Sequence, residues 1–236
     1  ALAGLSFSVR EREICGVIGP NGAGKTTLFN CLSRLYKPAE GDIRMGGRSL
    51  LALPSHDMVG MGIGRTFQNV ALFNTMTVRE NVMAGAYGIT KAGFLRNLLR
   101  TPATRREEHD TGQRADALIE MLGLQAHAGR AAGELPFGVR KRVELARAVA
   151  TSPKLLLLDE PAAGLNHDEL EALKRNILAL RDMNTAVLLV EHHVGMVMTL
   201  SDRVVVLNFG RKLAEGTPLE IQAHPEVIDA YLGASH

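Results

Sequence analysis

The chain has 236 residues, of which 46% are hydrophobic and 22% are charged, a composition typical of a globular protein with a sizeable core. The formal net charge is only +2, which excludes a nucleic-acid footprint spread over the whole surface. Tryptophan is absent and aromatic residues make up 4%, so the chain has little material for stacking nucleic-acid bases.

Three further features of the sequence indicate the cellular compartment and the relation to a membrane. Cys15 and Cys31 indicate a reducing compartment, and their simplest role is that of small apolar core residues. No run approaches the ~18 apolar residues that span a bilayer, and no basic-then-apolar leader is present, so we expect a soluble protein that needs another subunit at any membrane. The chain starts at Ala1 without a methionine, directly before a strand-like run at residues 5–9, so we expect that a segment precedes it.

Short apolar runs alternate with helix-length segments along much of the chain. The apolar runs predict buried parallel strands at residues 14–18, 155–158, 186–190 and 204–207. The segments predicted to be helices are residues 26–35, 139–150, 168–181 and 194–200. Because strands that alternate with helices are joined by crossover connections, the pattern predicts an α/β fold with a parallel sheet.

The middle of the chain has a different pattern. From about residue 70 to residue 150 the periodicity is helical, and the signals for strands fade. Residues 91–114 are rich in arginine, which indicates either the solvated surface of a helical lobe or a docking face near anionic lipid headgroups. We therefore expect one domain, with a catalytic α/β core at residues 1–68 and 151–236 and an inserted helical subdomain at residues 69–150.

A phosphate-binding motif follows the first buried strand. Residues 19–26, GPNGAGKT, match G-x-x-x-x-G-K-[ST] between a strand and a helix, a context that argues against a chance glycine-rich turn. Gly22 and Gly24 let successive N–H groups face phosphate oxygens, and the new helix adds the positive end of its dipole. Lys25 is expected to reach the β- and γ-phosphates, and the Thr26 hydroxyl to bind Mg²⁺. The expected nucleotide-binding residues are Gly19, Pro20, Asn21, Gly22, Ala23, Gly24, Lys25, Thr26 and Thr27.

Two acids end the buried strand at residues 155–158. Such a strand brings Asp159 to the carboxyl edge of the sheet, where ligands bind in open α/β folds. There Asp159 would hold Mg²⁺ through its water shell, and Glu160 could take a proton from an attacking water. An acidic strand end is often only a helix cap, but the phosphate-binding motif upstream favours the functional interpretation.

Four further segments, in the same order along the chain, resemble motifs of the ABC (ATP-binding cassette) ATPase family. Residues 65–69, RTFQN, resemble its Q-loop, and residues 135–142, LPFGVRKR, stand where its LSGGQ signature belongs. Residues 162–166, AAGLN, resemble its D-loop, and residues 190–193, VEHH, resemble its H-loop. A lone glutamine in a loop or a pair of histidines after a strand is commonly a surface feature, but six motifs in fixed order are specific. The resemblance implies a P-loop NTPase (RecA-like) core with an inserted helical subdomain.

The resemblance also implies roles for single residues. Gln68 is expected to sense the γ-phosphate and Mg²⁺ and to relay to a transmembrane partner, and His192 to act as the switch histidine beside Glu160. The signature segment is expected to contact ATP bound to a second subunit through Leu135, Pro136, Phe137 and Gly138. The family's adenine-stacking aromatic lies upstream of the segment that corresponds to residues 5–9, so the sequence assigns no adenine contact.

The chain departs from the family pattern at two motifs. In the signature, Pro136 replaces the usual serine, whose hydroxyl would have bonded the γ-phosphate, and Phe137 and Val139 replace glycine and glutamine. Backbone N–H groups around Gly138 and the helix N-terminus remain an anion site. In the D-loop, Asn166 replaces the usual aspartate. Both departures, and the tail at residues 216–221 and 224–233, resemble the branch that serves branched-chain amino-acid importers.

We therefore expect an ATP-hydrolysing subunit that energises an importer, with branched-chain or other hydrophobic amino acids as the solute class by association only. The expected cofactors are ATP and Mg²⁺. The expected partners are transmembrane permease subunits, a second ATPase subunit of the same or another kind and, indirectly, a solute-binding protein, with no nucleic acid. The expected place is the cytoplasmic face of the inner membrane. Three alternatives remain: a soluble cassette of DNA repair or translation, a lipid or lipopolysaccharide exporter, and a degenerate regulatory cassette.

Overall fold

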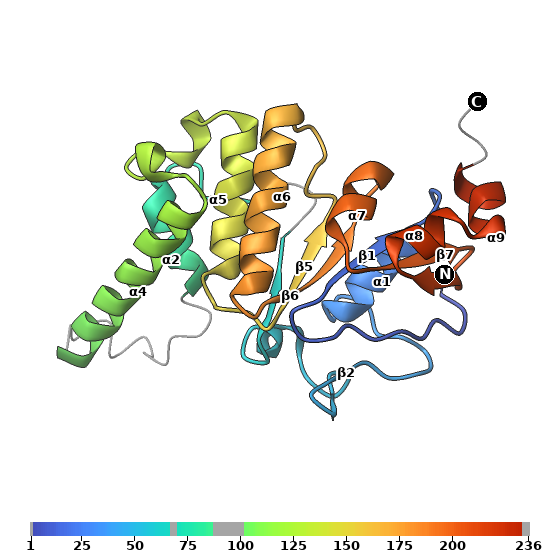
Figure 1. Ribbon diagram of the computed structural model, residues 1–236. Coiled ribbons are helices and arrows are strands. Elements are labelled where there is room, and N and C mark those ends of the chain that lie inside the picture. Colours follow the sequence, from blue (N-terminus) through green and yellow to red (C-terminus); the bar gives the residue numbers. More distant parts are fainter. Residues whose placement is uncertain (1, 67–69, 87–101, 233–236) are drawn as a thin grey trace.

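The structure, a computed structural model, describes residues 2–66, 70–86 and 102–232 (Figure 1). Its centre is a six-stranded sheet with the strand order β4-β5-β6-β1-β7-β8. All neighbouring strands are parallel except β7 and β8, which form an antiparallel hairpin. The strands of this sheet are β1 Ile14–Ile18, β4 Ile63–Arg65, β5 Leu155–Asp159, β6 Ala186–Val190, β7 Arg203–Asn208 and β8 Arg211–Gly216.

The central strands of this sheet carry apolar residues on both faces. Every residue of β1 and β6 is buried, because helices or other chain segments cover both sides of the sheet. The predicted α/β fold with a parallel-rich sheet is thus confirmed. The strand-like run at residues 5–9 is not a strand in the structure. Leu5, Phe7 and Val9 pack on the core in alternation, but this segment pairs with none of the strands in the described part of the chain.

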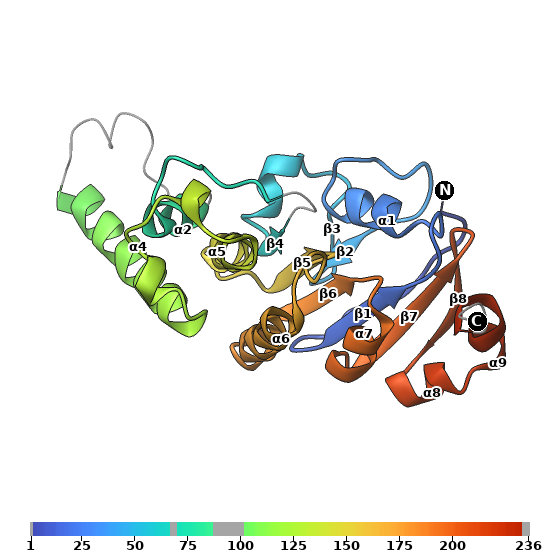
Figure 2. The ribbon, with the colours of Figure 1, turned by 90° about the horizontal axis from the view of Figure 1, so that it is seen from above.

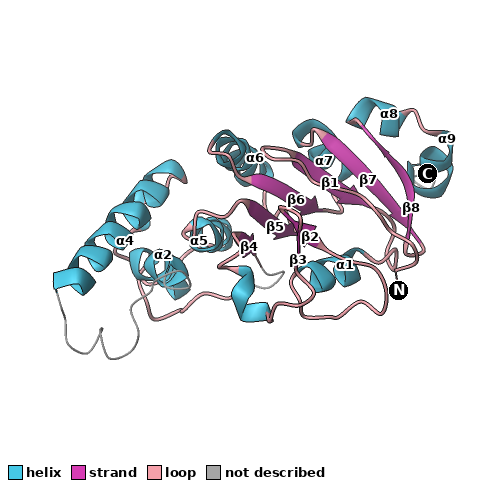
Figure 3. Ribbon diagram, turned by 90° about the horizontal axis from the view of Figure 1, so that it is seen from below, coloured by secondary structure: helices cyan, strands magenta, loops and turns pink. Residues whose placement is uncertain are grey.

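Helices cover the two faces of the sheet, and alternate strand residues point to each layer (Figures 2 and 3). One face packs against α1, Lys25–Leu32, through a cluster that includes Phe29 and Leu157. The other packs against α6, His167–Asp182, and α7, Val194–Leu200. The carboxyl ends of the parallel strands and the N-terminus of α1 therefore meet at one edge of the sheet, which is where a site can form.

Three helices pack against one another beyond the β4 edge of the sheet (Figures 1 and 3). They are α2 Val78–Ala86, α4 Pro102–Met121 and α5 Phe137–Val149. Of the arginine-rich segment, residues 91–101 lie outside the described residues and the rest belongs to α4. Within the described part of the chain, no helix has the length and apolar character that crossing a membrane requires.

The remaining elements are short. They are β2 Arg44–Met45 and β3 Arg48–Ser49, which form an antiparallel ribbon, and the helices η1 Ser55–Met58, η3 Gln125–His127, η4 Ala132–Glu134, α8 Pro218–Gln222, α9 Pro225–Val227 and η5 Ile228–Leu232.

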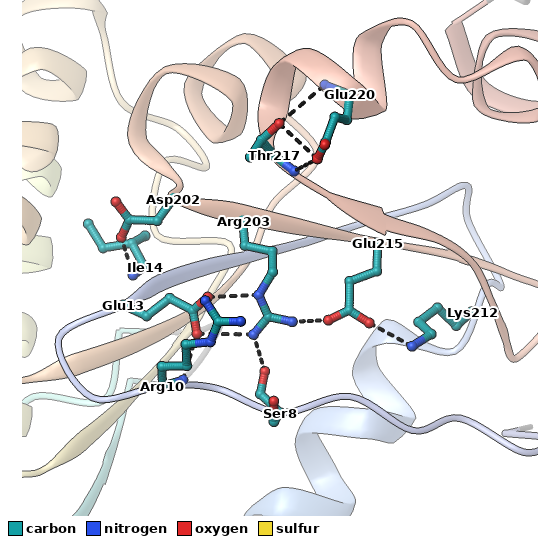
Figure 4. A network of polar contacts seen from close by, with 10 residues as sticks. All are labelled: Ser8, Arg10, Glu13, Ile14, Asp202, Arg203, Lys212, Glu215, Thr217 and Glu220. Carbon is teal, nitrogen blue, oxygen red and sulfur yellow. Dashed lines mark hydrogen bonds and ion pairs between the residues drawn. The ribbon is translucent and has the colours of Figure 1, made fainter.

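An ion-pair network joins the ends of β1, β7 and β8 at the edge opposite to the strand carboxyl ends (Figure 4). Arg203 donates from Nε to Glu13 Oε1 at 2.7 Å and from Nη2 to Glu13 Oε2 at 3.0 Å. It also donates to Glu215 and to the carbonyl oxygen of Ser8. Because all four residues come from different segments, the network fixes the incoming chain against the sheet.

Candidate active site

The phosphate-binding motif forms an open loop between β1 and α1. Gly22 has a φ of 80° and Gly24 a φ of 103°, both in the left-handed region that favours glycine. Gly24 is the N-cap of α1 and has no side chain, so no cap hydrogen bond satisfies the first N–H groups of the helix. These N–H groups can donate hydrogen bonds to an anion. The loop therefore fits a phosphate ligand.

Lys25 lies back over this loop. Its Nζ donates to the carbonyl oxygen of Gly19 at 2.6 Å and to that of Pro20 at 3.1 Å. The residue is only 5% exposed, and burial lowers the pKa of Lys25 while the charge of Glu160 opposes this effect. A bound phosphate would supply the negative charge that a desolvated ammonium needs, so Lys25 fits the predicted role.

Asp159 is the last residue of β5, and it is buried. Burial raises the pKa of Asp159, an effect that the charge of Arg65 opposes and that of Glu160 adds to. Arg65 lies at the end of β4, with its Nη2 3.3 Å from Asp159 Oδ2, and it also donates to Asn30 on α1 and to Ser33, the C-cap of α1. Arg65 therefore joins the phosphate-binding helix to the carboxylate expected to hold Mg²⁺. Sequence reasoning included Arg65 in the motif at residues 65–69 but assigned it no role.

Glu160 and His192 meet across the ends of β5 and β6. Glu160 Oε1 lies 2.9 Å from His192 Nε2. The backbone of Glu160 has a φ of 48°, a left-handed conformation that is strained for a residue with a side chain, and its N–H donates to Val190 O at 2.9 Å. Such strain is often found where a side chain must be aimed. Here it directs Glu160 toward the histidine and into the field of Lys25.

The structure separates the roles of the two adjacent histidines. His193 is the N-cap of α7, and its Nδ1 accepts a hydrogen bond from Met196 N at 3.1 Å. His192 instead contacts Glu160. His193 is thus a helix cap, and the role of switch stays a prediction for His192.

Glu191 is a further site residue, and sequence reasoning missed it. It is 3% exposed, and its carboxylate accepts hydrogen bonds from Ala162 N at 2.6 Å and from His192 N at 3.0 Å. It thereby ties the loop after β5, which carries Glu160, to the loop after β6. An acid directly after an all-apolar strand was the available signal, because a carboxylate is rarely buried without several donors.

The signature segment lies at the start of α5. Leu135 and Gly138 are buried, whereas Phe137 is half exposed. The predicted start of this helix at residue 139 was wrong, because Pro136 acts as the N-cap with a φ of −54° and a ψ of 153°, and α5 begins at Phe137. The contact of this segment with ATP in a second subunit stays a prediction.

The departure at Asn166 has a structural explanation. Asn166 is the N-cap of α6, where its Oδ1 accepts a hydrogen bond from Glu169 N at 3.0 Å. Glu169 Oε2 accepts a hydrogen bond from Asn166 N, also at 3.0 Å, which completes a capping box. Asparagine and aspartate cap helices about equally well, so the helix start tolerates the replacement.

Of the three expected Mg²⁺ ligands, the structure describes Thr26 and Asp159 but not Gln68. Thr26 is exposed at the start of α1, and Asp159 ends β5, so a hydroxyl and a carboxylate oxygen are available. Such oxygen donors fit Mg²⁺. Gln68, expected both as a ligand and as a catalytic residue, lies outside the described residues. Its roles stay predictions.

Comparisons with known proteins agree with this geometry. The family model described as "ABC transporter" matches residues 2–163, and that described as "Branched-chain amino acid ATP-binding cassette transporter" matches residues 211–236. The high-affinity branched-chain amino acid transport ATP-binding protein LivG of Salmonella typhimurium is 48% identical over 99% of this chain and 92% of its own length. The corresponding BraF of Pseudomonas aeruginosa is 46% identical over the same shares.

A transporter subunit of another kind and a solved structure are also similar to this chain. The lipopolysaccharide export system ATP-binding protein LptB of Haemophilus influenzae is 36% identical over 97% of this chain and 89% of its own length. The crystal structure of MJ1267, described as an ATP-binding cassette of an ABC transporter in its ADP conformation, has a TM-score of 0.84 and 31% identity over 99% of this chain and 92% of that chain. The fold, the order of the motifs and the matched residues together show that the chain belongs to the ABC transporter family.

Proposed function

We propose that this chain is the ATP-binding and ATP-hydrolysing subunit of an importer for branched-chain or other hydrophobic amino acids. The observation that carries the proposal is the meeting of three groups at one sheet edge: the buried Lys25 in its glycine loop, Asp159, and the contact between Glu160 and His192. The solute class is supported by the greater identity to relatives named for branched-chain amino acid transport, 48%, than to the lipopolysaccharide export protein, 36%.

The side chains divide the chemistry among them. Residues 19–27 bind the phosphates through backbone N–H groups and Lys25. When bound, Mg²⁺ neutralises phosphate charge, and Thr26, Asp159 and Gln68 are the residues that would hold it. Glu160 accepts the proton of the attacking water, and His192 holds Glu160 in place through the 2.9 Å contact. Catalysis on this view is mainly positioning and charge neutralisation.

A second subunit and a membrane partner complete the proposal. Two cassettes would pair head to tail, so that residues 135–138 of each face the nucleotide of the other. The helices α2, α4 and α5 pack against one another, and we propose that residues 69–150, within which they lie, are the subdomain that, with Gln68, relays to permease subunits. The chain would then act at the cytoplasmic face of the inner membrane, and a solute-binding protein would deliver the amino acid.

Uptake into reconstituted vesicles tests this function. The purified chain should hydrolyse ATP only with Mg²⁺, and together with permease subunits and a binding protein it should drive uptake of radiolabelled leucine. Lys25→Ala should lose both activities, since the contact to the β- and γ-phosphates is weakened. ATP hydrolysis that drives no uptake of leucine, isoleucine or valine would reject the solute class and leave the ATPase assignment standing. Absence of Mg²⁺-dependent hydrolysis in the wild-type chain would reject both.

A further inference from the structure

Arg65 is a largely buried cation that contacts both the sheet and α1. It ends β4, and in the pairing of β4 with β5 it lies opposite Leu157, two residues before Asp159. Because alternate residues of a strand share a face, Leu157 and Asp159 point to the same side of the sheet, the side that packs against α1. The side chain of Arg65 is 13% exposed, and its Cζ lies 5.9 Å from the centre of the Phe29 ring on α1. The sheet therefore places this guanidinium against α1 and beside Asp159.

The two Nη atoms of Arg65 join these neighbours. Nη1 donates to Ser33 Oγ at 2.6 Å, and Nη1 and Nη2 donate to Asn30 Oδ1 at 3.4 and 3.3 Å. Nη2 also donates to Asp159 Oδ2 at 3.3 Å. Because a guanidinium is planar and rigid, its contacts with α1 fix the direction from which Nη2 meets the carboxylate. A lysine ammonium, a single point on a flexible stem, would not fix that direction.

This contact takes up one of the two carboxylate oxygens of Asp159. In the described part of the chain, side-chain hydrogen bonds to Asp159 reach Oδ2, and none reaches Oδ1. Asp159 is 4% exposed, and a negative charge so buried is costly unless a positive partner lies close to it. Arg65 is that partner on the Oδ2 side. Oδ1 is therefore the oxygen that remains for a second cation at the carboxyl edge of the sheet.

We propose that Arg65 is a positioning residue for Mg²⁺ binding, which holds Asp159 by Oδ2 so that Oδ1 serves the metal. The proposal rests on the proposed function, in which Asp159 holds Mg²⁺. Carboxylates that bind metals are in turn fixed by hydrogen bonds, and loss of the fixing group typically weakens metal binding by about 10- to 100-fold. Repulsion between the guanidinium and Mg²⁺ acts in the opposite direction. Orientation outweighs it where the carboxylate reaches the metal through water, because a hydrogen bond to water depends strongly on direction.

Equilibrium binding of ATP at a series of Mg²⁺ concentrations tests this proposal. In Arg65→Gln, the Mg²⁺ concentration that gives half of the Mg²⁺-dependent change in ATP binding should rise by about 10- to 100-fold. ATP binding in excess EDTA should equal that of the wild type, since the donors of the phosphate-binding loop are unchanged. The control is Arg79→Gln, which breaks another arginine–aspartate pair, 2.6 Å from Asp116 between α2 and α4, and should alter neither quantity.

Two further variants separate orientation from charge and from stability. Arg65→Gln leaves a buried carboxylate without its partner, so Ser33→Ala repeats the test more mildly: it keeps Arg65 and Asp159 and removes the acceptor of Nη1. Its half-effective Mg²⁺ concentration should rise by a smaller factor than in Arg65→Gln. Arg65→Lys keeps the charge without the rigid fork, and it should resemble Arg65→Gln.

The opposite results are equally clear. An unchanged or lowered Mg²⁺ requirement in Arg65→Gln and Ser33→Ala would overturn the proposal, because repulsion of the metal would then match or exceed the effect of orientation. Wild-type behaviour of Arg65→Lys would leave charge alone as the role of Arg65. Equal losses of ATP binding with Mg²⁺ and in EDTA would mean that Arg65 only supports the fold around the loop. A wild-type chain that binds no ATP would reject the proposed function, and this proposal with it.

Discussion

Gly138 and Glu169 pack against each other so closely that a Cβ on Gly138 would overlap the Glu169 carboxylate. The same carboxylate closes the capping box of α6 by accepting a hydrogen bond from Asn166 N. A second contact of this kind joins Phe137 to Gly164, where a Cβ would lie 2.9 Å from the phenylalanine ring. The signature segment and the start of α6 therefore form one packed unit, and small residues on both sides make this possible.

Gly138→Ala should displace the Glu169 carboxylate and with it the capping-box hydrogen bond from Asn166 N. The lost capping contact, worth about 0.5–2 kcal/mol, offsets the gain of about 1 kcal/mol that alanine brings to a helix. In a Glu169→Ala background no carboxylate is displaced, so Gly138→Ala should stabilise the chain there by about 0.5–2 kcal/mol more than it does in the wild type. The measurement is urea-induced unfolding of the four chains at equilibrium. Equal effects of Gly138→Ala in the two backgrounds would show that the packing does not exist in solution.

The sequence predicted the elements that depend on local pattern and missed those that depend on neighbours. β1 and β6 were predicted with their observed bounds, because runs that are apolar on both faces have few other uses. β8 was missed, since Arg211–Gly216 is an edge strand with mostly polar residues. The helix expected at residues 26–35 ends at Leu32, because Arg34 has a φ of 59° and stops the helix there.

The residues of the candidate site also fall into those that a local motif predicts and those that depend on distant neighbours. Motif order located Lys25, Asp159 and Glu160, whose positions follow from a strand and the turn after it. Arg65 was assigned no role and Glu191 was missed, because their partners lie on other segments: Arg65 donates to Asn30 on α1, and Glu191 accepts from Ala162. Only the folded sheet, with β5 between β4 and β6, brings such segments together.

Glu13 should make the stability of the chain depend on pH. Burial alone would raise the pKa of Glu13, but hydrogen bonds from Arg203 and from the backbone of Arg10, with their charges, lower it below the usual 4.5. A carboxyl with a lowered pKa contributes stability that is full above its unfolded pKa and is lost as pH falls through the folded pKa. The wild-type free energy of unfolding should therefore decline as pH falls below about 4.5.

Glu13→Gln should remove this acid-dependent part and lower stability at pH 7. The side chains of Glu13 and Arg203 are 8% and 13% exposed, so removing the charge of Glu13 from this ion pair should cost about 3 kcal/mol of stability. Urea unfolding between pH 7 and pH 3 measures both effects. Glu226→Gln, a change at an exposed carboxylate, should follow the wild-type curve. A Glu13→Gln curve parallel to the wild-type curve at all pH values would contradict the assignment.

Glu191→Gln should separate turnover from nucleotide binding. The amide retains one acceptor oxygen but turns N–H donors toward either Ala162 N or His192 N, so one buried N–H loses its partner. The loops that carry Glu160 and His192 should lose their alignment, and kcat should fall while ATP affinity remains close to that of the wild type. Steady-state ATPase kinetics and equilibrium ATP binding measure the two quantities. Glu226→Gln again serves as control, and a normal kcat would exclude a positioning role.

Glu160→Gln tests the proposed catalytic step. The amide has nearly the same size and can keep the hydrogen bond to His192 Nε2, now 2.9 Å from Glu160 Oε1, but it cannot accept a proton from water. Turnover should therefore fall by about 10²–10⁴-fold, the range for a lost general base, with ATP binding intact. Single-turnover hydrolysis and equilibrium binding measure these effects, and hydrolysis at the wild-type rate would exclude Glu160 as the base.

The same variant tests the pairing of two cassettes. With hydrolysis blocked, ATP should persist between two subunits and hold residues 135–138 of each against the nucleotide of the other. Glu160→Gln should elute as a dimer on size exclusion with ATP and Mg²⁺ and as a monomer without nucleotide. Lys25→Ala should stay a monomer in both conditions, because its contact to the phosphates is lost. If Glu160→Gln binds ATP and yet remains monomeric, then hydrolysis takes place within one chain and the signature segment has another role.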